Sequence, residues 1–185
     1  MTKIKSICVY CGSQPGVSPE FSTQAIKLGQ EMAKYSKQLV YGGGTRGLMG
    51  DIARSVHEAD GHVTGIIPEF LLEHEADHKP ELYCNEVIVT ADMHERKQKM
   101  FEKSDAFIAM PGGVGTLEEL VEIMTWAQLG RHAKPIGLLN VGGFWNPFNS
   151  LIDHMSDSGF IHTQSNLNLI VMNDASELDK LLSGH

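Results

Sequence analysis

Seven short apolar runs, most of them separated by stretches with helical spacing, constrain the fold of this chain more than any other feature. The runs predict strands at Ser6–Tyr10, Gln38–Tyr41, His62–Ile67, Val87–Thr90, Ala106–Met110, Ile136–Leu139 and Leu169–Met172. Amphipathic patterns predict a helix that begins at Ser18-Pro19 and others at Leu48–Glu58, Met93–Lys103, Leu117–Leu129, Phe148–Ser156 and Ala175–Leu182. Apolar strands alternating with such helices form a parallel sheet covered on both sides. We therefore predict an α/β fold: a Rossmann-like doubly wound parallel sheet with helices on both faces, in a single domain over residues 1–185.

Length and composition limit the function. With 185 residues, 42% apolar and 21% charged, the chain has the makeup of one globular domain with its own core. The formal net charge of -8 argues against a nucleic-acid partner and against an anionic membrane surface. No N-terminal run has the pattern of a signal peptide, and no apolar stretch approaches the roughly 20 residues of a membrane span. Three cysteines, an odd number, predict free thiols in a reducing cytoplasm.

Three loops rich in small residues accompany the ends of predicted strands. Cys11-Gly12-Ser13 follows the first strand, Tyr41-Gly42-Gly43-Gly44-Thr45 ends the second, and Pro111 to Thr116 follows a later one. Ligands of doubly wound sheets bind beyond the carboxyl ends of the strands. Several such loops together indicate a site for a nucleotide-sized ligand.

The loop after Ala106–Met110 opens into a helix whose apolar residues Leu117, Leu120, Val121 and Met124 fall at helical spacing. Glycines let the backbone approach a phosphate closely, and the free N–H groups and positive dipole end of the helix face it. The sequence therefore predicts an anion cradle at this turn.

Glu119 lies about one turn inside this helix and has two interpretations. Thr116-x-x-Glu119 has the spacing of a capping box, in which Thr116 caps the N3 amide and Glu119 reaches back to the cap's own amide. Alternatively, Glu119 is a carboxylate that acts on a phosphorylated substrate. The glycine turn favours catalysis, because an anion there would already satisfy the helix's free donors. We expect the nearby Glu118 and Glu122 to be solvated or ion-paired.

Arg96 and Lys97 follow another helix start, with Asp92 and Glu95 in capping positions. One face of this helix carries Met93, Arg96, Met100 and Lys103. A guanidinium that shares a face with two methionines is either a snorkelling surface group or an inward-facing anion clamp. The residue pattern alone favours a surface position for the Arg96 side chain.

For two further motifs we favour a structural interpretation over a ligand-binding one. Gly42-Gly43-Gly44-Thr45-Arg46-Gly47 matches the dinucleotide fingerprint G-x-G-x-x-G, but neither Asp60 nor Glu69 is well placed as its acidic partner. We therefore favour a tight turn over a dinucleotide-binding site. His74-Glu75-Ala76-Asp77-His78 satisfies H-E-x-x-H, the zinc-protease motif, but Pro80 stops a helix and no third ligand is evident. An exposed loop or short helix is favoured over zinc.

The cysteines and tryptophans fit structural roles. Cys8-Val9-Tyr10-Cys11 is a C-x-x-C, but Cys8 falls inside a predicted strand, and Cys84 alone cannot supply the second pair of a zinc site. We therefore favour a structural role for these cysteines, as small buried side chains. We expect Trp126 and Trp145 in the core or in a subunit contact.

In this order, the motifs resemble the LOG (Lonely guy) family of cytokinin riboside 5′-monophosphate phosphoribohydrolases. The resemblance spans roughly Ile7 to Leu139. The matching stretches are Cys11-Gly12-Ser13, Tyr41-Gly42-Gly43-Gly44, Gly47-Leu48-Met49-Gly50, Met93-His94-x-Arg96-Lys97, Pro111-Gly112-Gly113-x-Gly115-Thr116-x-x-Glu119 and Thr125-Trp126-Ala127-Gln128-Leu129-Gly130.

The resemblance implies hydrolysis of the N-glycosidic bond of a purine nucleoside 5′-monophosphate, AMP or an N6-substituted AMP, to free base and ribose 5-phosphate. It implies a homodimer that uses neither metal nor cofactor, with Arg96 and Glu119 as the catalytic pair. The expected substrate-binding set is Ser13, Gly43, Glu75, Met93, Arg96, Lys97, Gly112, Gly113, Val114, Gly115, Thr116, Leu117, Glu118, Glu119 and Thr125.

The residue types agree with this chemistry. Glycoside cleavage passes through an oxocarbenium-like state, so a carboxylate near the anomeric carbon stabilises positive charge and can orient or deprotonate water. The glycine loop would hold the 5′-phosphate, which places the ribose near Glu119. Arg96 would position phosphate or ribose oxygens, or lower the pKa of Glu119; sequence leaves these alternatives open.

Two other functions compete. The first is a non-catalytic nucleotide-binding module that senses its ligand through the glycine loops, although Arg96 and Glu119 count against it. The second is an amino-acid decarboxylase. Pyridoxal chemistry needs a lysine that forms a Schiff base, and no lysine in the sequence is evidently placed for it.

Overall fold

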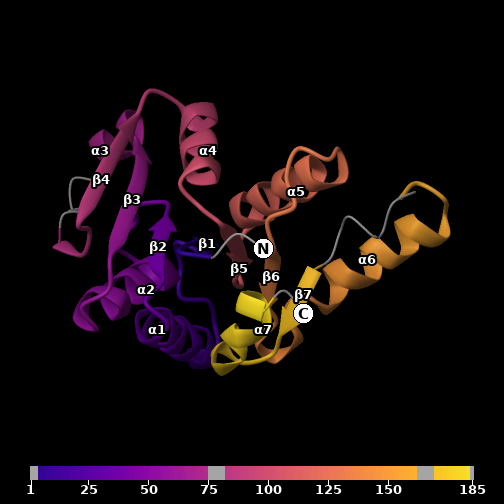
Figure 1. Cartoon of the computed structure of the whole chain (residues 1–185), viewed down its shortest axis with the longest axis horizontal. Helices are drawn as coiled ribbons and strands as arrows, with labels where there is room; N and C mark the ends of the chain where they lie inside the picture. The colour runs from indigo at the N-terminus through magenta and orange to yellow at the C-terminus, as the bar shows by residue number, and fades with distance from the viewer. Residues whose placement is uncertain (1–3, 75–81, 162–168, 184–185) are drawn as a thin grey trace.

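A parallel sheet forms the centre of the molecule (Figure 1). The computed structural model describes residues 4–74, 82–161 and 169–183. The strands are β1 Ser6–Tyr10, β2 Gln38–Tyr41, β3 Val63–Pro68, β4 Glu86–Thr90, β5 Ala106–Ala109, β6 Ile136–Leu139 and β7 Leu169–Met172. They form one sheet in the order β4-β3-β2-β1-β5-β6-β7, with every neighbouring pair parallel. The predicted α/β fold with a parallel sheet is confirmed.

Helices connect the strands and cover both faces of the sheet (Figure 1). Helices α1, α2 and α7 pack on one face, and α4, α5 and α6 contribute to the core on the other. The helices are α1 Pro19–Lys34, α2 Gly47–Glu58, α3 Glu69–His74, α4 Met93–Glu102, α5 Val114–Gln128, α6 Asn146–Asp157 and α7 Leu178–Ser183, with 3-10 turns η2 Val141–Gly143 and η4 Ala175–Glu177.

Alternation along the strands builds two cores. Ile7 and Val9 of β1 join the core beneath α1 and α2, while Cys8 and Tyr10 join the core beneath α4 and α5. Burial raises the pKa of the Cys8 and Cys11 thiols far above its usual range, so they stay protonated. The interpretation of the C-x-x-C as buried small side chains is confirmed, and neither cysteine is in a disulfide.

Several elements differ from the sequence prediction by one or two residues, and three differ more. Helix α5 begins at Val114 rather than Leu117, because glycines and a lone valine carry no apolar periodicity of their own. The short α3 was not predicted, since a single amphipathic turn after a proline gives little signal. The C-terminal helical pattern divides into η4 and α7, with Asp174 capping the first of them by accepting from the Ser176 amide.

The two tryptophans differ in burial. Trp145 is buried, and its Nε1 donates to the carbonyl of Ala109 at 3.2 Å, which confirms a core position. Trp126 is half-buried, with its ring edge-on to Phe101 at 5.0 Å between centroids. Within the described ranges, none of the helices has both the length and the apolar character needed to cross a bilayer.

The direction of winding reverses between β1 and β5, because β2 to β4 extend to one side of β1 and β5 to β7 to the other. Loops at such a reversal leave the sheet in opposite directions and open a crevice at the carboxyl ends of the strands. The predicted ligand loops after β1 and β5 both begin at this point.

Candidate functional site

The loops after β1 and β5 meet at the crevice. The amide of Gly12 donates to the carbonyl of Pro111 at 3.1 Å, and the amide of Met49 donates to the carbonyl of Gly12 at 3.4 Å. A Cβ at Gly112 would overlap the Thr116 side chain and the Gly12 amide. Glycine at position 112 therefore lets the two loops close against each other.

Helix α5 begins at this contact with unoccupied amide donors. Its N-cap is Gly113, which has no side chain to cap the helix, and the Leu117 amide donates to the Gly113 carbonyl at 3.1 Å. The amides of Val114, Gly115 and Thr116 precede that bond and have no carbonyl within the helix. A Cβ at Gly115 would meet no described atom within 4 Å, so a ligand can approach this backbone closely.

This helix start contradicts the capping-box interpretation. Thr116 is the third residue of α5 rather than its cap, and its side chain is buried. Glu119 lies in the second turn, where it cannot reach the amide of Gly113 as a capping-box glutamate would. The carboxylate is therefore available for another role.

Arg96 faces inward, against the surface interpretation that its sequence context favoured. The residue is 7% exposed. Its Nε donates to the carbonyl of Ile66 at 3.2 Å and its Nη2 to the carbonyl of Gly42 at 3.2 Å. A Cβ on Gly42 would overlap the guanidinium. Gly42, the first residue of the three-glycine run, thus makes room for Arg96, a function that the G-x-G-x-x-G pattern did not suggest.

Arg96 and Glu119 approach each other across the crevice, and we call them the Arg96–Glu119 pair. Nη1 of Arg96 lies 4.0 Å from Oε1 of Glu119, and Glu119 is 9% exposed. Burial raises the pKa of Glu119 from 4.5 to about 7, although the positive charge of Arg96 opposes this shift. The carboxyl group therefore changes its protonation state near neutral pH, which suits a proton-transferring group.

Lys97 forms a second contact between α4 and α5. Its Nζ pairs with the carboxylate of Glu118 and lies 3.1 Å from Oε1 of Glu122. Burial would lower the pKa of Lys97, but the hydrogen bonds with Glu118 and Glu122 outweigh it and raise that pKa. Lys97 is therefore a stable ammonium ion, and the expectation that the two glutamates are paired is confirmed.

Other predicted residues lie around this pair, on loops and at the start of α4. The Ser13 carbonyl abuts Gly47 at the start of α2, and Gly43 has a positive φ of 77° beside Ile67. The Sδ of Met93 lies 3.7 Å from Nη1 of Arg96. These positions surround the carboxyl ends of β1, β2 and β3.

Of the other predicted residues, Thr125 is not brought to the pair. Thr125 is exposed, its Oγ1 donates to the carbonyl of Val121 at 2.8 Å, and it lies about 9 Å along α5 from Glu119 on a different face. Glu75 lies outside the described residues, as does most of the H-E-x-x-H motif. Where the chain is described, no three His, Cys, Asp or Glu side chains converge as metal ligands.

Comparison with known proteins gives consistent matches. Residues 49–182 match the family model described as "Possible lysine decarboxylase". The cytokinin riboside 5′-monophosphate phosphoribohydrolase LOG5 of Arabidopsis thaliana is 48% identical over 184 residues, which cover 100% of this chain and 79% of that protein. This chain belongs to the LOG family. The cytokinin riboside 5′-monophosphate phosphoribohydrolase LOG of Oryza sativa subsp. japonica is 47% identical, over 96% of this chain and 72% of that LOG protein.

Solved structures share the fold of this LOG-family chain at lower identity. The molybdenum cofactor binding protein from Rippkaea orientalis is 23% identical with a TM-score of 0.69, over 100% of this chain and 98% of the other. The molybdenum cofactor carrier protein from Chlamydomonas reinhardtii is 20% identical with a TM-score of 0.67, over 98% and 99%. Likeness at these identities concerns the fold alone.

Proposed function

We propose that this protein hydrolyses the N-glycosidic bond of purine nucleoside 5′-monophosphates, AMP or N6-substituted AMP such as cytokinin riboside monophosphates, and releases the free base and ribose 5-phosphate. The observation that carries the proposal is the Arg96–Glu119 pair, 4.0 Å apart and buried beside the open start of α5. The names of the LOG relatives at 46–48% identity support the same reaction.

The 5′-phosphate binds at the start of α5 in this proposal. The free amides there and the positive end of the helix dipole favour a phosphate. Gly112 to Leu117 line this end of the helix, with Ser13 and Gly43 on the neighbouring loops. Glu119 is about 7.5 Å along the helix from Val114, a distance that suits the ribose of a nucleotide held by its phosphate.

Glu119 serves as the acid–base group. The bond between C1′ and N9 breaks with its electron pair going to the base, and positive charge develops on the ribose ring. The carboxylate stabilises that charge and takes a proton from the attacking water as oxygen bonds to C1′. The proton then passes to the departing base. A carboxyl group whose pKa is about 7 can both accept and return the proton near neutral pH.

Arg96 acts on Glu119 rather than on the phosphate. Its Nε and Nη2 are already occupied by the carbonyls of Ile66 and Gly42, and its Nη1 faces Glu119. These contacts favour one of the two roles that the sequence left open. The guanidinium limits how far burial can raise the pKa of Glu119, so ionised carboxylate is present near pH 7.

The description "possible lysine decarboxylase" is not supported by the lysines near the site. A Schiff-base lysine needs a lowered pKa, whereas the hydrogen bonds of Lys97 with two glutamates raise its pKa. The pKa of Lys134 is lowered by burial, but Lys134 precedes β6 at the amino edge of the sheet, away from the crevice.

We further propose a homodimer. Val114, Leu117 and Val121 form an exposed apolar stripe on α5, and Leu151 and Met155 are exposed on α6, which has no fully buried residue. Exposed apolar groups on neighbouring helices indicate a surface that a second copy covers. Figure 1 shows α6 projecting from the body of the domain beyond α5.

Chromatography of the reaction products tests the proposed activity. Wild-type protein should release adenine from AMP, and faster than from adenosine or ADP, because the phosphate site is built for one terminal group on the ribose. The Glu119→Gln variant should release base at least about a hundredfold more slowly. Binding of AMP without any base release from the wild type would instead support the nucleotide-sensing module.

A further inference from the structure

The carboxylate of Glu122 lies outside the predicted site but contacts a residue within it. Lys97 reaches from α4 to α5, where it pairs with Glu118 and with Glu122. The side chains of Lys97 and Glu122 are 12% and 26% exposed, whereas that of Glu118 is 52% exposed. The contact with Glu122 is therefore the more shielded of the two, and water and salt weaken it less.

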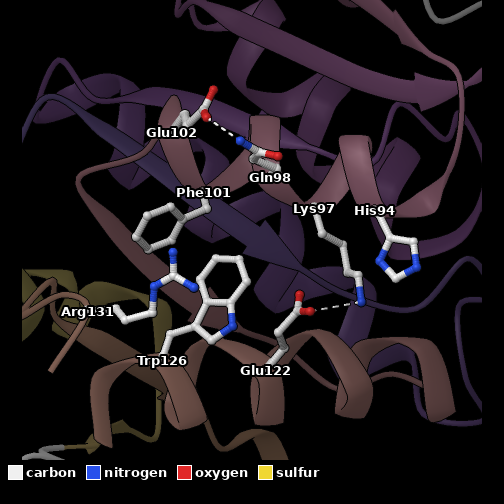
Figure 2. A pocket seen from close by; sticks show the side chains of 8 residues that line it. All are labelled: His94, Lys97, Gln98, Phe101, Glu102, Glu122, Trp126 and Arg131. Carbon is white, nitrogen blue, oxygen red and sulfur yellow. Dashed lines mark hydrogen bonds and ion pairs between the residues drawn. The ribbon is translucent and has the colours of Figure 1, made fainter. Parts of the chain in front are cut away.

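A cavity of about 380 Å³ separates α4 from α5 beside this contact (Figure 2). Its lining residues are His94, Lys97, Gln98, Phe101, Glu102, Glu122, Trp126 and Arg131. Figure 2 shows the Lys97–Glu122 contact crossing between the two helices, with Phe101, Trp126 and Arg131 grouped apart from it. Beside the ring contact between Phe101 of α4 and Trp126 of α5, the Lys97–Glu122 ion pair links the two helices at the level of the site.

This link is adjacent to the Arg96–Glu119 pair. Lys97 follows Arg96 on α4, and Glu122 lies one turn after Glu119 on α5. Two ion pairs, one beside the other, therefore connect the same two helices. A shift of α4 relative to α5 would change both the 3.1 Å and the 4.0 Å separations.

We propose that Glu122 is a positioning residue for the hydrolysis: it holds Lys97 against α5, so that the Lys97 ammonium faces the nucleotide and Arg96 stays beside Glu119. The inference rests on the proposed function. When a nucleotide binds, Lys97 exchanges the exposed Glu118 for the phosphate and retains Glu122. The two glutamates thus differ in role, one displaced by the substrate and the other a permanent anchor.

Glu122 also acts on Glu119 through its charge. Burial is the main cause of the raised pKa of Glu119, and the negative charges of Glu118 and Glu122 raise it further. The titratable or charged groups near Glu119 are Arg96 and Lys97 from α4, Glu118 and Glu122 from α5, and Cys8, Tyr10 and Cys11 from β1 and the loop after it. Removal of the Glu122 charge lowers the pKa of Glu119, so activity should extend to lower pH.

The Glu122→Gln variant tests this role against a matched control, Glu102→Gln. Glu102 lines the same cavity but accepts from Gln98 at 2.9 Å and pairs with Lys99 at 3.8 Å. In Glu122→Gln we expect KM for AMP to rise roughly three- to tenfold, the effect of losing one of two charge-assisted hydrogen bonds to Lys97. The low-pH limb of kcat/KM should move to lower pH. Glu102→Gln should match the wild type in both respects.

A Glu122→Asp variant guards against a failure to fold. Its carboxylate is withdrawn from Lys97 by one methylene, so its KM should lie between those of the wild type and Glu122→Gln. If Glu122→Gln does not fold, a KM of Glu122→Asp above that of Glu102→Gln supports the proposal. A KM and pH profile equal to those of Glu102→Gln, in either Glu122 variant, overturn it.

Calorimetric titration with AMP separates this inference from the proposed reaction. If the wild type releases no base, the proposed hydrolysis fails, but Glu122 still positions Lys97 when its Gln variant binds AMP more weakly than Glu102→Gln does. Equal AMP affinities of the two variants overturn the positioning role, whether or not the wild type is an active enzyme.

Discussion

Replacing Arg96 by Gln tests whether the guanidinium keeps Glu119 ionised. Two unit charges 4.0 Å apart attract by about 4 kcal/mol at an effective dielectric constant of about 20. One pKa unit corresponds to about 1.4 kcal/mol, so loss of this attraction raises the pKa of Glu119 by up to about three units. Starting from a pKa of about 7, the ionised fraction at pH 7 falls from about one half to about one in a thousand. We therefore expect kcat/KM for AMP at pH 7 to fall by up to roughly 500-fold.

Release of adenine from AMP, measured by chromatography across about pH 5 to 9, is the assay. For the wild type, kcat/KM should rise with pH through about 7, because the reaction requires the ionised carboxylate. For Arg96→Gln the rise should move to higher pH, with part of the activity restored in alkaline buffer. The Arg96→Lys variant keeps the charge and should keep a pH profile nearer to that of the wild type. A uniform loss of activity in Arg96→Gln, with the pH midpoint unchanged, would refute the argument and assign Arg96 to the substrate.

Three other predictions follow from the same geometry. Glu119→Gln should raise the free energy of unfolding at pH 8 by on the order of 3 kcal/mol. Burial raises the pKa of Glu119 from 4.5 to about 7, so above pH 7 the folded protein carries the full cost of a buried, ionised carboxylate. The Gln side chain removes that cost. Thermal melts should show this gain shrinking to nothing as pH falls below 4.5, where folded and unfolded states are both protonated; an equal gain at every pH contradicts it. Gly42→Ala should displace the Arg96 guanidinium and lower kcat/KM for AMP by roughly a hundredfold. Gly44→Ala, whose Cβ would lie nearest to the Met49 side chain, should have a smaller effect, and equal losses would argue against the steric explanation. Leu151→Glu with Met155→Glu should convert a dimer to a monomer in light scattering, and a dimer that persists would place the interface elsewhere.

Local patterns predicted the fold well. The apolar runs at β1, β2, β6 and β7 predicted the observed bounds. In β1 and β6, burial of every residue leaves a continuous apolar run in the sequence. Ser18 was correctly expected to cap α1, and its Oγ accepts from the Glu20 amide at 3.3 Å. The start of α5 was missed because Thr116 and Glu119 have the spacing of a capping box without the geometry of one.

The candidate site depends on contacts that no local pattern encodes. The acceptors of Arg96 are carbonyls 30 and 54 residues away, so its inward orientation follows from the pairing of β2 and β3 rather than from its own helix. The pKa of Glu119 likewise results from burial in the folded domain and from the charges of Arg96 and Lys97 on another helix. Sequence motifs could identify both residues through a family resemblance, but not the distance or the charge state that relates them.

The surroundings of the Arg96 guanidinium limit which substitutions LOG-family sequences can accept at two positions. Both of its acceptors are main-chain carbonyls, at Gly42 and Ile66, so the hydrogen bonds survive any exchange of the Ile66 side chain that preserves strand pairing. At position 42 the constraint is steric, since any larger residue would occupy the volume of the guanidinium. Position 66, whose side chain is buried in the core, should therefore accept other apolar residues, whereas position 42 should accept glycine alone, although each supplies the same kind of acceptor.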